Sequence, residues 1–508
     1  MESFINKHQD HIVGTLSCFD RIIFKGYLPI SHEKGCEALF YDQQWLIKQF
    51  KYKAPQLSQQ IAEHAQNYAA LNQRPFMTLP PKTNKEELAR DFVRQEGLAP
   101  GLIAVFKVLE PCRSFKVIGG KRRPHLKGKA RKCNFFYFYF LDREFGLMHV
   151  RVQSWLPFPI QIYINGHEWL ARKMDRHGIG YTKIDNAFSR IEDLPRAQRF
   201  ANNLCKKHWP KVLEAFARRV NPHLRTILAG MEHYWCCDQC ETAIDLMFKD
   251  RVSLKSLYKK LVEHALLCFG AEDVMTFLGK KVHGNFKGEL ITDLKVRQAG
   301  ARVKHRIKGN WIKMYDKYGL VLRIETVINQ PREFQVFRQG QRKGQIVHGW
   351  FPMAKRVTNL PRYFEISVAA CRRYLEALSI VDDPRQAYDD LHNLTRSRVR
   401  SGRQARGLNP LHLDDAQLFA AVLRGEHVIK GFRNKDIVRV LYRSKPSCSR
   451  VAKRRSRKVT RLLGILWTHG LVAKIPRSRR WRVTDKGRRL MSGTVVLRNQ
   501  DIPERLVG

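Results

Sequence analysis

Long apolar runs are missing from this chain of 508 residues. It contains no stretch of 18 apolar residues, so the sequence offers no candidate for a membrane-spanning helix. The most apolar segment, 135–141, has only the length of a β-strand. A signal-peptide pattern and a basic amphipathic helix with a clean apolar face are also missing. We therefore expect a cytoplasmic protein that has no membrane partner.

Acidic residues are scarce: the chain has 46 Asp and Glu against 93 Lys and Arg, a formal net charge of +47. The basic residues are spread along the whole length. A hydrophobic content of 44% is enough to bury cores, which excludes a disordered basic tail. A folded protein of this charge repels itself unless a polyanion neutralises it. We expect nucleic acid as the partner, with DNA as the first choice, RNA as the alternative and a nucleoid-associated bacterial location.

The 11 cysteines do not form a pattern that indicates disulfides, because their number is odd and they are scattered. Cys237 and Cys240 make one Cys-x-x-Cys pair, but a structural zinc site needs a second ligand pair at similar spacing. We therefore expect free thiols and no zinc. The phosphate-binding P-loop, the dinucleotide glycine fingerprint and the Gly-x-Ser-x-Gly elbow are missing as well.

The pattern of strands and helices predicts an α+β multidomain chain, with a mixed antiparallel-sheet body and helical insertions. Between two predicted strands, 119–132 reads as a basic, glycine-containing loop, and we expect Lys121, Arg122 and Arg123 there to touch phosphates. A solvated loop is the alternative. The expected divisions are an N-terminal α/β segment 1–110, a β-rich segment 111–165, a helical segment 166–299, a β-meander with a long helix 300–396, a basic linker 397–409, and a C-terminal domain 410–508.

The last hundred residues give the strongest local pattern. Helices are predicted at 414–424, 434–442 and 452–469, and two strands at 471–475 and 480–483 flank a basic turn. Over 410–492 this order resembles the winged-helix (winged helix-turn-helix) family. The resemblance implies that the third helix enters the major groove of DNA and that the hairpin lies near the adjacent backbone.

The residues that this resemblance assigns to nucleic-acid binding are all basic. On the third helix they are Lys453, Arg454, Arg455, Arg457, Lys458 and Arg461, and at the hairpin tip they are Arg477, Arg479 and Arg480. A winged helix used for protein contacts is the alternative.

The segment 300–330 reads as a three-stranded meander with a hairpin loop at Lys317-Tyr318-Gly319. Strand alternation places five residues on one face, which we expect to be exposed: Lys313, Tyr315, Lys317, Arg323 and Glu325. Tyrosine is a candidate nucleophile for a phosphodiester, and the cations would stabilise the charge that develops on phosphate. Asp316 and Glu325 are the candidate ligands of Mg²⁺ or Mn²⁺.

Residues 311–328 also resemble a segment of rolling-circle replication initiators, in which a Leu-Arg-x-Glu strand follows an aromatic-Asp-Lys ending. The resemblance implies DNA nicking, but the His-hydrophobic-His metal motif of those initiators is missing here. The chain as a whole resembles large basic bacterial proteins of mobile-element type whose activity is uncharacterised, which favours replication, transposition or recombination.

Two alternatives remain open at this stage. One is a non-enzymatic regulator or structured-RNA-binding protein, in which Arg323 and Glu325 form a structural ion-pair network. The other is a metal-dependent nuclease that uses the 313–325 face. The sequence does not fix the oligomeric state.

Overall fold

The computed structural model describes most of the chain. The described residues are 1–120, 123–280, 290–297, 300–342, 344–381, 384–409, 412–427, 431–442, 444–476, 478–496 and 498, without the side chains of 297 and 384–389. They form fifteen α-helices and mixed β-sheet, which confirms the α+β class. Within this described part, no helix combines the length and the apolar character needed to cross a bilayer.

The chain folds into two units, each built from segments that are distant in sequence. Unit 1 contains residues 1–13, 248–324 and 369–508, and unit 2 contains 14–247 and 325–368. The chain passes from unit 1 to unit 2 inside strand β13 (Val321–Ile328) and back inside helix α10 (Leu360–Leu378). The two units are therefore interleaved along the sequence.

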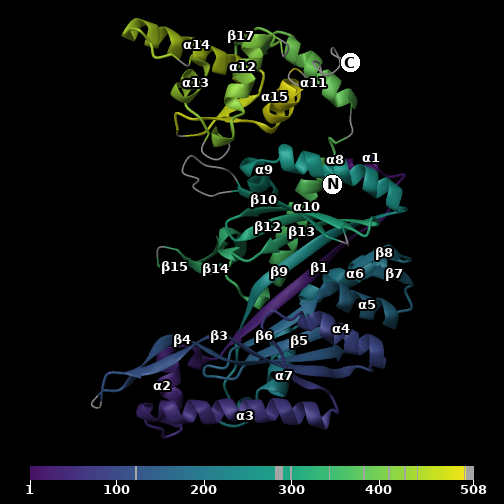
Figure 1. The fold of residues 1–508 in the computed structure, drawn as a ribbon, viewed down its shortest axis with the longest axis vertical. Helices are drawn as coiled ribbons and strands as arrows, with labels where there is room; N and C mark the ends of the chain where they lie inside the picture. Colours follow the sequence, from purple (N-terminus) through teal and green to yellow (C-terminus); the bar gives the residue numbers. More distant parts are fainter. Residues whose placement is uncertain are drawn as a thin grey trace. The chain divides into compact units, whose positions relative to one another are not determined.

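Unit 2 is organised around a sheet whose strands follow in the order β9-β1-β6-β5-β4-β3-β2 (Figure 1). All pairs from β1 to β3 through β6, β5 and β4 are antiparallel, and β2 is parallel to β3. These strands are β1 (Ile12–Tyr27), β2 (Phe76–Thr78), β3 (Gly101–Ile118), β4 (His125–Asp142), β5 (Gly146–Gln153), β6 (Ile160–Asn165) and β9 (Tyr234–Phe248).

Helices and short hairpins complete unit 2. Helices α3 and α4 pack against β3, whereas α5 and α7 pack against β5. The bounds are α2 (Glu33–Asp42), α3 (Phe50–Leu71), α4 (Lys85–Glu96), α5 (Gly166–Arg176), α6 (Leu194–Asn203), α7 (Trp209–Val220), β7 (Tyr181–Ile184), β8 (Ala187–Ile191), β14 (Gln335–Arg342) and β15 (Gln345–Pro352). Trp169 of α5 and Trp209 of α7 are buried in the core, as are Phe158 and Ile162.

The β3–β4 hairpin is longer than the sequence indicates. Strand β4 begins at His125, so most of the predicted loop 119–132 is strand paired with β3. Helix α2 supports the ribbon, because Glu37 accepts a hydrogen bond from the Leu126 backbone N–H at 2.6 Å and Glu33 accepts one from Gly128 at 3.1 Å. The loop prediction was wrong because backbone pairing with β3 tolerates a run of exposed lysines on a two-stranded ribbon.

Unit 1 contains a second set of strands in the order β10-β11-β12, all antiparallel. At the end of β12, Tyr318 and Gly319 both have positive φ, and Gly319 is in the left-handed position that the sequence predicts. The elements are α1 (Glu2–Lys7), α8 (Arg251–Leu267), α9 (Ala271–Phe277), β10 (Leu290–Arg297), β11 (Gly300–Ile307), β12 (Asn310–Lys317) and α11 (Pro384–Thr395).

The C-terminal part of unit 1 has the predicted three helices followed by two strands, and a further helix comes after them. Its elements are α12 (Leu413–Val422), α13 (Asn434–Leu441), α14 (Ser449–Thr468), β18 (Val472–Lys474), β19 (Trp481–Val483) and α15 (Asp485–Val496). The stretch predicted as a linker, 397–409, contains the hairpin of β16 (Arg398–Arg400) and β17 (Arg403–Ala405), closed at Ser401 and Gly402, which both have positive φ.

Candidate nucleic-acid interface and carboxylate cluster

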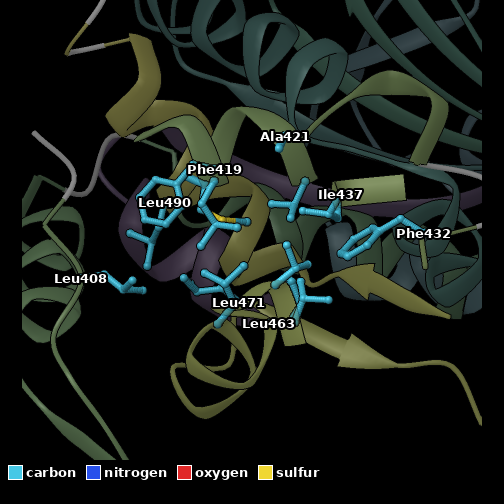
Figure 2. Close-up of a cluster of buried hydrophobic side chains, with 14 of the residues drawn as sticks. Leu408, Phe419, Ala421, Phe432, Ile437, Leu463, Leu471 and Leu490 are labelled. Atoms are coloured by element: carbon cyan, nitrogen blue, oxygen red, sulfur yellow. The ribbon is translucent and has the colours of Figure 1, made fainter. Parts of the chain in front are cut away.

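The C-terminal helices are held together by one apolar core. Figure 2 shows Phe419 of α12, Ile437 of α13 and Leu463 of α14 in the same cluster, together with Leu471 and Leu490. Each of these side chains is 0–5% exposed. Burial of such side chains stabilises a fold by about 1.5–3 kcal/mol each, so this cluster fixes the orientation of α14.

The two-stranded hairpin after α14 is fixed by backbone pairing. Gly470 ends α14 with a φ of 74°, a left-handed conformation that glycine adopts without strain. Val472 then pairs with Val483 and Lys474 with Trp481. Trp481 also exchanges two backbone hydrogen bonds with Phe432, at 2.8 and 2.9 Å, so a residue before α13 extends the hairpin.

One face of α14 is strongly basic. Its buried residues Val459, Leu463 and Leu466 form a stripe at helical spacing. At 100° per residue, the exposed Lys453 lies on the side of the helix away from this stripe, and beside it lie five further exposed cations: Arg450, Arg454, Arg457, Lys458 and Arg461. Their side chains form no hydrogen bond or ion pair with any other residue that the structure describes. We call these five residues the α14 cation face.

The other basic residues predicted to bind nucleic acid are placed less uniformly. Lys453 is exposed on α14, whereas Arg455 donates to the Ser444 carbonyl at 2.6 Å and lies 4.8 Å from the Tyr442 ring centroid. Arg479 is exposed and Arg480 donates to the Gly431 carbonyl at 3.3 Å. In the β3–β4 hairpin Arg123 is exposed. Lys121, Arg122 and Arg477 lie outside the described residues.

The predicted chemical site on β12 is a row of cations interleaved with aromatic rings. The Lys317 ammonium lies 5.2 Å from the Tyr315 ring centroid, and the Lys304 ammonium lies 4.4 Å from that of Trp311. In the β11–β12 register, Arg302 is opposite Tyr315 and Lys304 is opposite Lys313. Tyr315 and Lys317 are half-buried.

Strand β13 does not present the exposed face that the sequence suggests. All eight of its residues are buried, including Arg323 at 0% and Glu325 at 2% exposure. Helix α10 contributes to this burial, because the Cys371 thiol contacts the Ile324 carbonyl and the Thr326 hydroxyl donates to the Ser367 carbonyl. The alternation of the sequence shows which residues share a face, but not that a central strand is covered on both faces.

Glu325 lies in a buried carboxylate cluster with Asp20 of β1 and Glu241 of β9. One carboxylate oxygen from each residue lies within 4.8 Å of the other two, and all three residues are at most 8% exposed. Oxygen ligands about 2.1 Å from a Mg²⁺ ion are about 3 Å apart when adjacent and about 4.2 Å apart when opposite. Small side-chain rotations would therefore let the three carboxylates bind one ion, and their all-oxygen chemistry suits Mg²⁺ or Mn²⁺.

Asp20 is oriented by neighbours on two other elements. His167, at the first turn of α5, has its Nδ1 atom 3.2 Å from Asp20 and its Nε2 atom 3.3 Å from Asp245. Asn186 donates a hydrogen bond to the Asp20 carboxylate. Asn165 caps α5 by accepting from the His167 backbone N–H at 2.8 Å, which fixes the backbone at the start of the helix.

Arg21, next to Asp20, is a cation that interacts with this cluster. Burial alone would lower its pKa, but the carboxylates of Glu241 and Asp20 and the neighbouring Tyr163 raise it above the ordinary value. The guanidinium therefore stays charged and compensates part of the negative charge. No local pattern indicates this cluster, because its three carboxylates come from strands that lie far apart in the sequence.

Asp316, the predicted partner of Glu325 at a metal site, has a local role in the hairpin. Its carboxylate accepts a hydrogen bond from the Gly319 backbone N–H at 2.8 Å. Burial raises its pKa, and this hydrogen bond and Lys255 only partly oppose the shift. Among the described residues, the carboxylates grouped with Glu325 are Asp20 and Glu241 rather than Asp316.

Comparison of the chain with protein-family models, with curated proteins and with solved structures found no match.

Proposed function

We propose that this protein binds duplex DNA through helix α14. The observation that supports this function best is the α14 cation face, where five exposed cations have no partner among the described residues. Like charges at helical spacing destabilise a helix unless an anion neutralises them. The regularly spaced phosphates of a DNA backbone supply such anions, and several cations along one helix can contact them.

The surrounding elements support a winged-helix mode of binding. Three helices share one apolar core, α14 follows α13, and the β18–β19 hairpin comes directly after α14. In proteins of this type the helix in the position of α14 enters the major groove, which is wide enough to admit an α-helix. The Phe432–Trp481 pairing gives the hairpin a third backbone partner.

Binding of a labelled duplex by the full-length protein tests this proposal. The triple variant Arg454→Ala, Lys458→Ala and Arg461→Ala removes three charges from the α14 cation face, and we expect at least tenfold weaker binding. The matched control removes three exposed cations at similar spacing from α8, namely Arg251→Ala, Lys255→Ala and Lys259→Ala. Equal losses in both triple variants would show that the net charge, and not α14, determines binding.

A second function, metal-dependent phosphodiester cleavage, is supported by the carboxylate cluster. Three buried carboxylates close to one another are costly unless cations compensate them, and a divalent ion would do so while activating a water molecule. The same geometry would also suit a structural ion-pair network with Arg21. Duplex binding together with cleavage is the combination that a replication, transposition or recombination protein of a mobile element needs.

A metal-binding experiment distinguishes a metal site at the carboxylate cluster from a structural ion-pair network with Arg21. If the cluster binds Mn²⁺, the ion stabilises the wild-type protein by about 2.7 kcal/mol at 100 times its dissociation constant. The variant Glu325→Gln should lose this stabilisation and any metal-dependent nicking. A melting temperature that Mn²⁺ does not change would contradict the metal site. Tyr315→Phe then tests the tyrosine separately, because only a nucleophilic tyrosine forms a covalent adduct with DNA.

A further inference from the structure

A groove in unit 2 combines cations, aromatic rings and a helix N-terminus. It has a volume of about 840 Å³ and lies between the start of α3, the outer part of the β3–β4 hairpin and Trp155. Its five cations are Lys48, Lys51, Lys116, Lys129 and Arg131, and its aromatic residues are Phe50, Tyr52, Phe115 and Trp155. Among the described residues that line it, none carries a carboxylate. We call it the α3 groove.

Two cations of the α3 groove, Lys51 and Lys116, are placed where their charge destabilises the fold. Helix α3 has no acidic residue in its first turn and no side chain that caps its N-terminus, and Lys51 adds positive charge to this positive end of the helix dipole. In the β3–β4 register, Lys116 is directly opposite Lys127, a like-charge pair. None of the five cations forms an ion pair with a described residue. A bound anion would remove this electrostatic cost.

The aromatic side chains offer surfaces for stacking. Tyr52 is 61% exposed on α3. The Arg131 guanidinium lies 3.7 Å from the centroid of the Trp155 ring and covers one face of the indole. The indole N–H of Trp155 is buried and has no acceptor among the described residues. Stacking surfaces beside cations suit a ligand that has both planar rings and phosphates.

We propose that the α3 groove binds unpaired nucleotides of a single nucleic-acid strand. Bases in a duplex are already stacked on each other, so aromatic side chains gain contact only with bases that are unpaired. The cations would contact the backbone while Tyr52 and Trp155 stack on bases. This inference rests on the proposed nucleic-acid function and adds a second site, with a different ligand form from the duplex at α14.

Fluorescence anisotropy with three probes tests the inference on the full-length protein. The probes are a short labelled oligothymidylate, a strand of the same length made only of abasic sites, and a blunt duplex. Loss of one stacked base weakens single-strand binding by about 5- to 140-fold, so we expect this loss for Tyr52→Ala and Trp155→Ala. Binding of the abasic strand should stay the same, because it depends on the cations alone.

The control variants separate stacking from folding. Tyr41→Ala removes another tyrosine, 83% exposed on α2 and outside the groove, and should not change binding of any probe. Trp155→Phe keeps an aromatic ring and should retain most of the affinity that Trp155→Ala loses. Since Tyr52 is exposed, Tyr52→Ala remains informative even if Trp155→Ala fails to fold. An oligouridylate probe in parallel shows whether the strand bound is RNA or DNA.

The outcomes distinguish failure of this inference from failure of the proposed function. Equal affinity for the intact and abasic strands, unchanged by Tyr52→Ala, would overturn the stacking groove. If the duplex binds through α14 and no single strand binds, the α3 groove is overturned while the duplex-binding function remains. Absence of binding to every probe would overturn both.

Discussion

Asp273 makes the stability of unit 1 dependent on pH near neutrality. This residue of α9 is 5% exposed and accepts a hydrogen bond from the Gly270 backbone N–H at 2.6 Å. Burial raises the pKa of Asp273 to about 9, and a hydrogen bond shared with Asp485 of α15 adds to the shift. The carboxyl group therefore keeps its proton in the folded protein, whereas in the unfolded chain it ionises above about pH 4.

The sign and the size of the effect follow from this difference. Between about pH 4 and about pH 9 the folded state binds one more proton than the unfolded state, so the free energy of unfolding falls as pH rises. The largest slope for one proton is about 1.4 kcal/mol per pH unit, which gives up to about 2.7 kcal/mol between pH 6 and pH 8. Asp273→Asn keeps an acceptor for Gly270 and removes the titrating group.

Denaturant unfolding of the wild type and of Asp273→Asn, at about pH 6 and about pH 8, measures this pH dependence of the free energy of unfolding. We expect Asp273→Asn to be more stable than the wild type at the higher pH, by a margin that shrinks at the lower pH. Asp436→Asn is the control, because Asp436 accepts an equivalent hydrogen bond from the Arg433 backbone N–H at 2.8 Å in α13 but is more exposed. If the wild type and Asp273→Asn differ in free energy of unfolding by the same amount at both pH values, the reasoning is refuted.

Two further changes test the packing of the two candidate sites. Leu463→Ala in the C-terminal core should reduce the free energy of unfolding by about 2–5 kcal/mol, measured by denaturant unfolding, whereas Lys453→Ala on the exposed side of α14 should have little effect. Gly166→Ala should destabilise unit 2 by about 1–3 kcal/mol and weaken Mn²⁺ binding, because a Cβ atom there would lie 2.1 Å from the Phe19 carbonyl oxygen next to Asp20. An unchanged melting temperature in Gly166→Ala would contradict this close approach.

The C-terminal elements were predictable because their signals are local. Helical spacing of Val459 and Leu463, a capping aspartate at the start of α13 and Gly470 at the end of α14 all act within a few residues. The element order is therefore confirmed from α12 to β19. The additional pairing of Phe432 with Trp481 joins residues that are distant in sequence, and no local pattern indicates it.

The carboxylate cluster could be predicted only in part. Glu325 was identified from the Leu-Arg-Ile-Glu strand, but its neighbours Asp20 and Glu241 come from strands that lie far from it in the sequence. Asp316 is close to Glu325 in sequence, and we therefore expected it to be the second metal ligand. Its carboxylate instead accepts a hydrogen bond from the Gly319 backbone N–H in the same hairpin turn. Which strands become neighbours in a sheet depends on long-range pairing, and spacing along the chain does not reveal it.

The salt dependence of duplex binding tests the central claim most directly. If all five residues of the α14 cation face contact phosphates, the logarithm of the association constant should fall with the logarithm of salt concentration at a slope of about −4.5. Removing Arg454, Lys458 and Arg461 should bring the slope to about −1.8, while the α8 triple variant keeps the wild-type slope. A slope that is the same in all three proteins would contradict duplex binding through α14.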